Sequence, residues 1–106
     1  MRLIGILIIP AVLFGQGGSA ENGKKLFLRD GCYECHGYAG QGGAGARLAP
    51  KVMAVDNFIK YVRRPTGAMP PYTAKVASDQ DLTDIRAFLA TIPEPPAAKD
   101  IPLLKP

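Results

Sequence analysis

Hydrophobic residues recur at helical spacing in two segments of the chain. Residues 52–64 carry apolar side chains three and four positions apart, and Pro65 follows, so the pattern predicts a helix that ends there. The second segment follows Ser78, a residue type that caps helix starts, and its first turns carry aspartates. Its apolar stripe stops before Pro93, which ends the helix. The stripe residues of the two segments are Val55, Phe58, Ile59, Val62, Leu82, Ile85, Phe88, Leu89 and Ile92.

A shorter pattern near the N-terminus predicts a first helix over residues 21–30. Asn22 is its expected cap, Leu26 and Phe27 are its apolar contacts, and Gly31 ends it. A helix of this length is marginal in water, so it must pack against another element. Nowhere does the chain alternate apolar and polar residues as a strand would. The pattern therefore predicts an all-α domain.

The segments between these helices are irregular in composition. Five of the nine residues from 37 to 45 are glycine, which excludes a helix or strand and favours backbone lying close against a flat group. The alternative is a flexible linker between two domains. Residues 65–72 form a proline-stiffened loop that carries Met69, and residues 93–106, with five prolines, predict an extended tail.

The first 20 residues have the pattern of a secretory signal peptide. Arg2 is a short basic region, residues 3–14 are mostly apolar, and residues 15–20 are small or polar. A retained membrane anchor is the alternative, but glycines and a proline interrupt the apolar run, and a span needs about 20 apolar residues. We therefore expect a periplasmic protein with no integral membrane span after cleavage, comprising a domain at 21–92 and a tail at 93–106.

The remaining chain is small and mildly basic. Without Arg2 it carries 12 basic and 9 acidic residues, a formal charge of +3, with no polybasic run. This balance argues against nucleic acid as a partner. A chain of 86 residues, from 21 to 106, is near the lower limit for folding on its own core, so a covalent or metal crosslink is expected.

The chain's only two cysteines and only histidine lie together in the run Cys32-Tyr33-Glu34-Cys35-His36. This C-x-x-C-H spacing is typical of haem c attachment, in which both thiols add to the porphyrin and the imidazole is an axial ligand. A thioredoxin-type redox pair would need a βαβ context, which the sequence lacks. A zinc site would need four ligands, and only three of the usual kind exist.

The second axial ligand of a haem at His36 would have to be a methionine, because there is no other histidine. Met1 is lost with the signal peptide, which leaves Met53 and Met69. Met53 is expected in or at the start of a helix, where methionines pack in cores, whereas Met69 lies in a stiff loop that can present its thioether. We therefore predict Met69. Histidine and methionine together suit electron transfer and leave no open position for catalysis. The alternative is an open-site haem protein, such as a small peroxidase or gas sensor.

The segment from Glu21 to Ile92 resembles a class I cytochrome c. The resemblance includes the Cys32–His36 run, the turn Gly45-Ala46-Arg47-Leu48, Met69 with its prolines, and two pairs on the outer helices, Gly23 with Phe27 and Ile85 with Phe88. It implies three to four short helices around one covalently attached haem, with the first and last helices crossing. Many members have proline after the turn glycine, and its carbonyl accepts the histidine proton; this chain has Ala46.

The resemblance also implies a protein redox partner, a dehydrogenase or an oxidase. The sequence around Arg47, Tyr61 and Met69 is similar to that of small cytochromes that serve as electron-accepting subunits of exported dehydrogenases. Basic residues predominate between the two ligands, with Asp56 the single acid, and would form a positive docking surface at the haem edge. They are Arg47, Lys51, Lys60, Arg63, Arg64 and Lys75.

Overall fold

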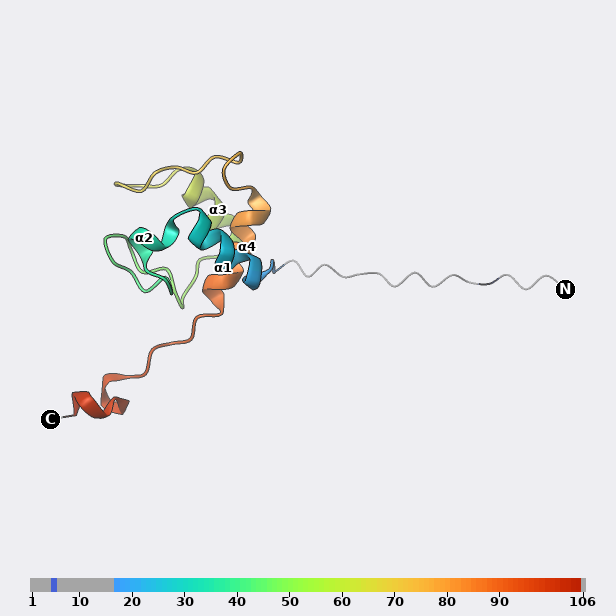
Figure 1. Cartoon of the computed structure of the whole chain (residues 1–106). Coiled ribbons are helices and arrows are strands. Elements are labelled where there is room, and N and C mark those ends of the chain that lie inside the picture. Colours follow the sequence, from blue (N-terminus) through green and yellow to red (C-terminus); the bar gives the residue numbers. More distant parts are fainter. Residues whose placement is uncertain (1–4, 6–16, 106) are drawn as a thin grey trace.

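The computed structural model describes residue 5 and residues 17–105. These residues form four α-helices and two short 3-10 helices, with no strand among them (Figure 1). The helices are α1 (Ala20–Arg29), α2 (Cys32–His36), α3 (Val55–Arg63) and α4 (Asp79–Ala90). The predicted all-α class is confirmed. Most of the predicted signal peptide, residues 1–4 and 6–16, lies outside the described residues.

Helix α1 begins one residue earlier than predicted, and its cap is different. The hydroxyl oxygen of Ser19 accepts a hydrogen bond from the backbone N–H of Asn22 at 3.1 Å, so Ser19, not Asn22, is the N-cap. The prediction was wrong because Ser19 was assigned to the signal peptide and left out of the domain. The Asn22 side chain instead donates to the carboxylate of Asp84 on α4 at 2.8 Å.

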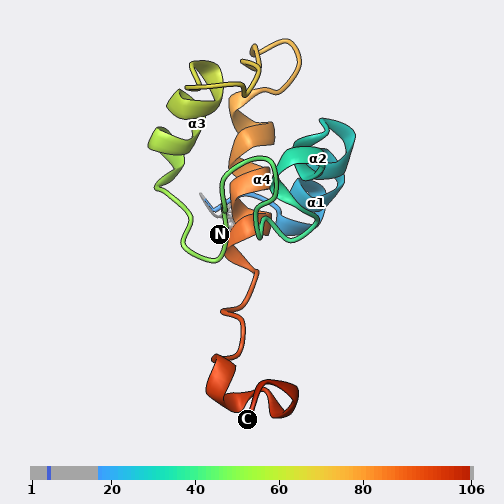
Figure 2. The same ribbon diagram turned by 90° about the vertical axis from the view of Figure 1, so that its left-hand side faces the viewer.

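The first and last helices cross, as the resemblance implied (Figure 2). Gly23 lies against the backbone of Asp84, and a side chain at position 23 would collide with that backbone. Next to this close approach, the rings of Phe27 and Phe88 pack with centroids 5.5 Å apart and planes tilted by 57°. Glycine therefore sets the distance between the helices, and the aromatic pair fills the crossing.

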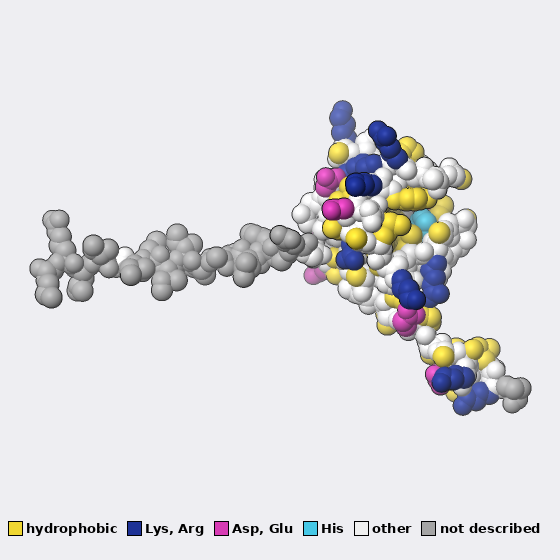
Figure 3. All heavy atoms as spheres, turned by 180° about the vertical axis from the view of Figure 1, so that it is seen from behind, with side chains coloured by type: hydrophobic (Ala, Val, Ile, Leu, Met, Phe, Trp, Pro, Cys, Tyr) yellow, Lys and Arg dark blue, Asp and Glu magenta, His cyan; other side chains and the backbone are white. Residues whose placement is uncertain are grey.

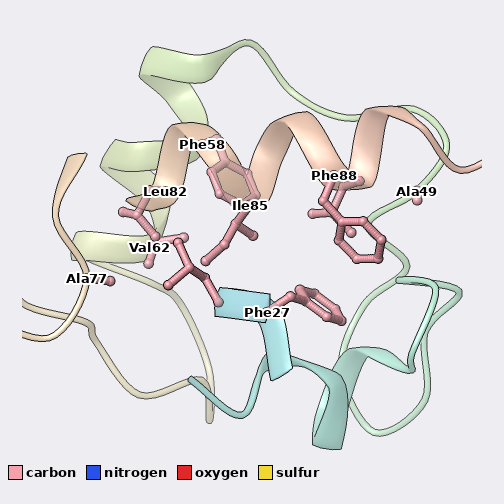
Figure 4. Close-up of a cluster of buried hydrophobic side chains, with 10 residues drawn as sticks. Phe27, Ala49, Phe58, Val62, Ala77, Leu82, Ile85 and Phe88 are labelled. Carbon is pink, nitrogen blue, oxygen red and sulfur yellow. The ribbon is translucent and has the colours of Figure 1, made fainter. Parts of the chain in front are cut away.

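The hydrophobic core lies between α1, α3 and α4, and Figure 4 shows side chains from all three pointing toward one another. Phe27 and Leu89 are fully buried. Helix α3 starts at Val55, three residues later than predicted, and contributes Phe58 and Val62. The buried hydrophobic residues are Leu26, Phe27, Ala49, Phe58, Val62, Ala77, Leu82, Ile85, Phe88 and Leu89.

Helix α4 has the start that the sequence predicted. The Ser78 hydroxyl accepts from the Asp81 N–H at 3.0 Å, and the Asp81 carboxylate accepts from the Ser78 N–H at 3.1 Å, which is a reciprocal capping box. The helix ends at Ala90, before Pro93. No helix in the described part of the chain is long and apolar enough to cross a membrane.

The C-terminal segment leads away from the helical domain (Figures 1 and 2). Its first residues are extended, as the prolines predicted. Two short 3-10 helices follow at Ala98–Asp100 and Pro102–Leu104, which the sequence did not indicate. Leu103 and Leu104 are 95% and 61% exposed, so this segment carries apolar side chains that the domain does not bury.

Candidate haem site

The C-x-x-C-H run forms its own short helix, α2, which the sequence analysis did not predict. Gly31 precedes it in the left-handed conformation, at φ 76°, and Gly37 follows it. On a helix, residues three and four positions apart share a face, so Cys32 is adjacent to both Cys35 and His36. Both thiols are free: Cys32 is half-buried and Cys35 is exposed. The helix thus presents two thiols and one imidazole from a single turn.

The glycine-rich segment folds back onto α2 and holds the histidine. The N–H of Gly42 donates to the carbonyl of His36, and the N–H of Gly45 donates to the carbonyl of Cys35, each at 2.8 Å. A side-chain carbon at position 45 would lie 2.9 Å from the His36 ring, so only glycine fits this approach. The segment therefore lies against the imidazole and is not a linker between domains.

The His36 ring is oriented by the turn that the family resemblance identified. Its Nδ1 lies 2.6 Å from the carbonyl oxygen of Ala46, the residue that replaces the usual proline. Because a carbonyl can only accept, Nδ1 carries the proton and the lone pair of Nε2 is available to a metal. The alanine thus supplies the same backbone acceptor.

The chemistry of Cys32 disfavours thiol-disulfide exchange. Burial, with a smaller contribution from the Asp30 carboxylate, raises the pKa of the Cys32 thiol to about 11. Reactive thiols in exchange enzymes have lowered pKa values, because the thiolate is the nucleophile. The part of the chain that the structure describes also holds no group of three His, Cys, Asp or Glu side chains placed to bind a metal ion.

The two candidate methionines have different surroundings. Met69 lies in the irregular loop between α3 and α4, and its side chain packs against the hydrophobic core while remaining partly accessible. Met53 precedes α3 by two residues, outside the helix where the sequence placed it, and is 47% exposed. Its carbonyl accepts a hydrogen bond from Arg86 at 2.9 Å. Of the two, Met69 is the methionine in contact with the core.

The Met69 loop is held at its far end by a single guanidinium group. Arg63, at the end of α3, donates to the carbonyls of Tyr72 and Ala77 at 3.0 and 2.8 Å, and to the Asp79 carboxylate at 2.7 Å. The Tyr72 N–H also donates to the carbonyl of Val62 at 3.1 Å. Sequence reasoning assigned Arg63 to a docking surface. The structure instead engages its guanidinium within the domain.

The residues around these groups fit a flat apolar cofactor. The partly buried hydrophobic residues that pack against the core include both sequence-predicted groups, Cys32 and Met69, and Figure 3 shows hydrophobic side chains gathered around the histidine. Two thiols, an oriented imidazole and a thioether make up the donor set of a haem c site. The remaining partly buried residues of this set are Tyr33, Leu48, Val52, Ile59, Tyr72 and Ile92.

Comparison with known proteins identifies the family of the chain. The family model described as "Cytochrome C oxidase, cbb3-type, subunit III" matches residues 18–89, which is more than half of the chain. The chain belongs to this family of c-type cytochromes. Cytochrome c-555 of Methylococcus capsulatus (strain ATCC 33009 / NCIMB 11132 / Bath) is 26% identical over 90 residues, which cover 82% of this chain and 73% of that relative. No solved structure matches the chain.

This class I cytochrome c is an electron carrier that uses haem c and exchanges electrons with a redox partner. The haem supplies the one-electron couple of its iron, and the protein supplies orientation, burial and a contact surface. Sequence reasoning singled out the Cys32–His36 run and Met69 as candidate site residues. It missed Tyr72 and Arg63 as supports of the Met69 loop, because their partners are mostly backbone carbonyls distant in sequence. No sequence spacing reports such contacts.

Proposed function

We propose that the cytochrome carries single electrons in the periplasm on one haem c, attached through Cys32 and Cys35 and ligated by His36 and Met69. The observation that carries this proposal is the 2.6 Å contact between His36 Nδ1 and the Ala46 carbonyl, which leaves Nε2 to the iron. A filled sixth position has no room for a substrate. The protein is accordingly a carrier and not an enzyme, whether it acts free or as the cytochrome subunit of an oxidoreductase complex.

The surroundings of Met69 support its role as the second ligand. A thioether ligand must be held at a fixed place over the ring, and the Met69 loop is joined to α3 through Arg63 and through the Tyr72 N–H. Histidine and methionine ligation raises the haem potential, because the soft thioether stabilises the reduced iron. Such a site suits an acceptor of electrons from a dehydrogenase.

The ligand assignment is tested by comparing Met69→Ala with Met53→Ala in the holoprotein. Ferric haem with a methionine ligand has a weak absorption band at the red end of the spectrum, and its reduced form binds carbon monoxide poorly. Met69→Ala should lose the band and bind carbon monoxide readily, whereas Met53→Ala should keep the wild-type spectrum. An unchanged Met69→Ala spectrum would refute the assignment and favour an open-site haem protein.

The covalent attachment and the number of haems are tested by intact mass. The exported protein should exceed the mass of its polypeptide by one haem, and denaturation should not release it. Replacing both Cys32 and Cys35 with alanine should remove that increment. A colourless wild-type protein with two titratable thiols would contradict the proposal.

We further propose that a leader within residues 1–20 directs export, and that the helical domain is followed by a partner-binding tail at 93–106. The exposed Leu103 and Leu104 support the last point, because a short apolar segment outside the core can dock on a partner at low entropic cost. Deleting residues 93–106 should preserve the haem spectrum and abolish co-purification with the native dehydrogenase or oxidase. Co-purification of the truncated protein would exclude this role.

A further inference from the structure

The backbone before helix α1 is built into the domain, although the sequence pattern assigns it to the leader. Ser19 caps α1, and its carbonyl accepts from the N–H of Gly23 at 2.8 Å. The Ser19 N–H donates to Oδ1 of Asp84 at 2.8 Å. A side-chain carbon at Gly18 would lie 2.8 Å from the Thr83 carbonyl oxygen. Both residues therefore contact α4, the last α-helix of the domain.

Asp84, which accepts the hydrogen bond from the Ser19 N–H, is the single buried charged residue of the described chain, at 6% exposure. Its Oδ1 accepts from Ser19 N–H and from the Gln80 amide at 3.0 Å, and its Oδ2 accepts from the Asn22 amide at 2.8 Å. A carboxylate has about four acceptor positions, so three of them are in use. Removal of Ser19 would take away one of the three hydrogen bonds to the buried Asp84 carboxylate.

Three cuts fit the small-residue rule of leader peptidases, which needs small residues one and three positions before the cut. A cut after Ala20, with Gly18 at the third position, and a cut after Ser19, with Gly17 at the third position, would both remove Gly18 and Ser19 from the mature protein. The cut after Gly17, preceded by Gly15 at the third position, keeps both. A side-chain carbon built at Gly17 would have no atom within 4 Å, whereas one built at Gly18 would touch α4. The family match also begins at residue 18.

We infer that the leader is cut between Gly17 and Gly18, and that the new amino group of Gly18 pairs with Asp84. Hydrolysis adds one water across the Gly17–Gly18 peptide bond, leaving a carboxylate on Gly17 of the released leader and an ammonium on Gly18. A substituent on the Gly18 α-carbon already comes within 2.9 Å of Asp84 Oδ1. Freed from residue 17, the ammonium can turn toward the remaining acceptor position of the carboxylate.

This inference rests on the proposed export and is tested by N-terminal sequencing and intact mass of the exported holoprotein. Gly18 should be the first residue, and the mass should equal residues 18–106 plus one haem. Any other first residue, or an uncut leader, overturns the cut site. The haem increment is read from the same spectrum independently of the first residue, so failure of the cut site and failure of haem attachment are distinguishable.

The role of Asp84 is tested with holoproteins exported behind a foreign leader that fixes the first residue. The chain starting at Gly18 should melt about 4–8 °C above the chain starting at Glu21, because the latter lacks the helix cap. Asp84→Asn should lower the melting temperature more in the Gly18 chain than in a chain that starts at Gly17, which keeps the Ser19 N–H but has an amide in place of the Gly18 ammonium. Asp56→Asn, an exposed control, should act equally in both. Equal effects of Asp84→Asn would overturn the pairing.

Discussion

The hydroxyl group of Tyr72 donates a hydrogen bond to the carbonyl oxygen of Asp30 at 2.7 Å. Tyr72 lies three residues after Met69, and Asp30 caps helix α1 two residues before Cys32. The bond therefore joins the loop of the proposed methionine ligand to the segment that leads into the haem attachment run. This contact, between residues 42 positions apart in sequence, joins the two halves of the proposed site.

Tyr72→Phe should weaken methionine ligation while preserving the fold. The change removes one partly buried hydrogen bond, worth about 1 kcal/mol, which corresponds to a melting temperature lower by about 4–8 °C. With the loop less restrained, the reduced protein should bind carbon monoxide more readily. Tyr38→Phe is the matched control, because the Tyr38 ring is 69% exposed and stacks on Tyr33 without needing its hydroxyl. If both variants behaved alike, the bond to Asp30 would have no role in holding the loop.

Arg63→Gln should destabilise the domain far more than Arg64→Gln. Both changes remove one positive charge, but Arg63 donates to the carbonyls of Tyr72 and Ala77 and to Asp79, whereas Arg64 is exposed. We expect a loss of about 2–4 kcal/mol for Arg63→Gln and less than about 0.5 kcal/mol for Arg64→Gln, measured by denaturant unfolding. A loss of the red methionine band in Arg63→Gln alone would place its effect on the Met69 loop. Similar unfolding energies for the two variants would contradict the assignment.

The sequence predicted those features that local pattern determines. The stripe on α4, its Ser78 cap and the chemical identity of the Cys32–His36 run all depend on residues a few positions apart. The crossing of α1 and α4 came from resemblance, because the fit of Gly23 against Asp84 involves residues 61 positions apart. Pattern reasoning therefore found α1, α3 and α4 but not the distance between α1 and α4.

Each error has its own physical origin. Ser19 was lost from the domain because the small-residue rule for leader cleavage and the cap preference of helices select the same residue types. Helix α2 was missed because its five residues show no apolar periodicity, and its boundaries are set by Gly31 and Gly37. Arg63 was grouped with surface cations because charge alone does not reveal that its guanidinium donates to the backbone carbonyls of Tyr72 and Ala77.

Asp84 should make the free energy of unfolding depend on pH in the acidic range. Burial raises the pKa of Asp84, but hydrogen bonds from Asn22, Ser19 and Gln80 outweigh it and lower the pKa below its usual value. A lowered folded-state pKa means that the unfolded chain binds more protons, so the stabilisation is present above about pH 4 and is lost as the pH falls through the folded-state value. Unfolding measured from pH 7 to pH 2 should show this loss in the wild type.

The Asp84→Asn variant should lack that part of the acid dependence. It should already be less stable at pH 7, by about 1–3 kcal/mol, because a neutral amide forms weaker hydrogen bonds and supplies one acceptor oxygen in place of two. Its stability should then fall less steeply below about pH 4 than that of the wild type. Parallel curves for the two proteins would show that Asp84 does not carry the acid sensitivity.

The exposed cations proposed to form the docking surface should govern the rate of electron exchange with anionic reagents. With Arg63 engaged in the domain, the basic surface proposed for docking consists mainly of Lys51, Lys60, Arg64 and Lys75, all exposed. Oxidation of the reduced protein by hexacyanoferrate(III) should slow as salt is added, while oxidation by a cationic cobalt(III) complex should quicken, because screening removes attraction in one case and repulsion in the other. Lys60→Glu on α3 should slow the anionic reaction severalfold at low salt, and Lys24→Glu on α1 should leave it nearly unchanged. Equal effects of the two reversals would mean that the net charge of the protein, and not this surface, steers the reagent.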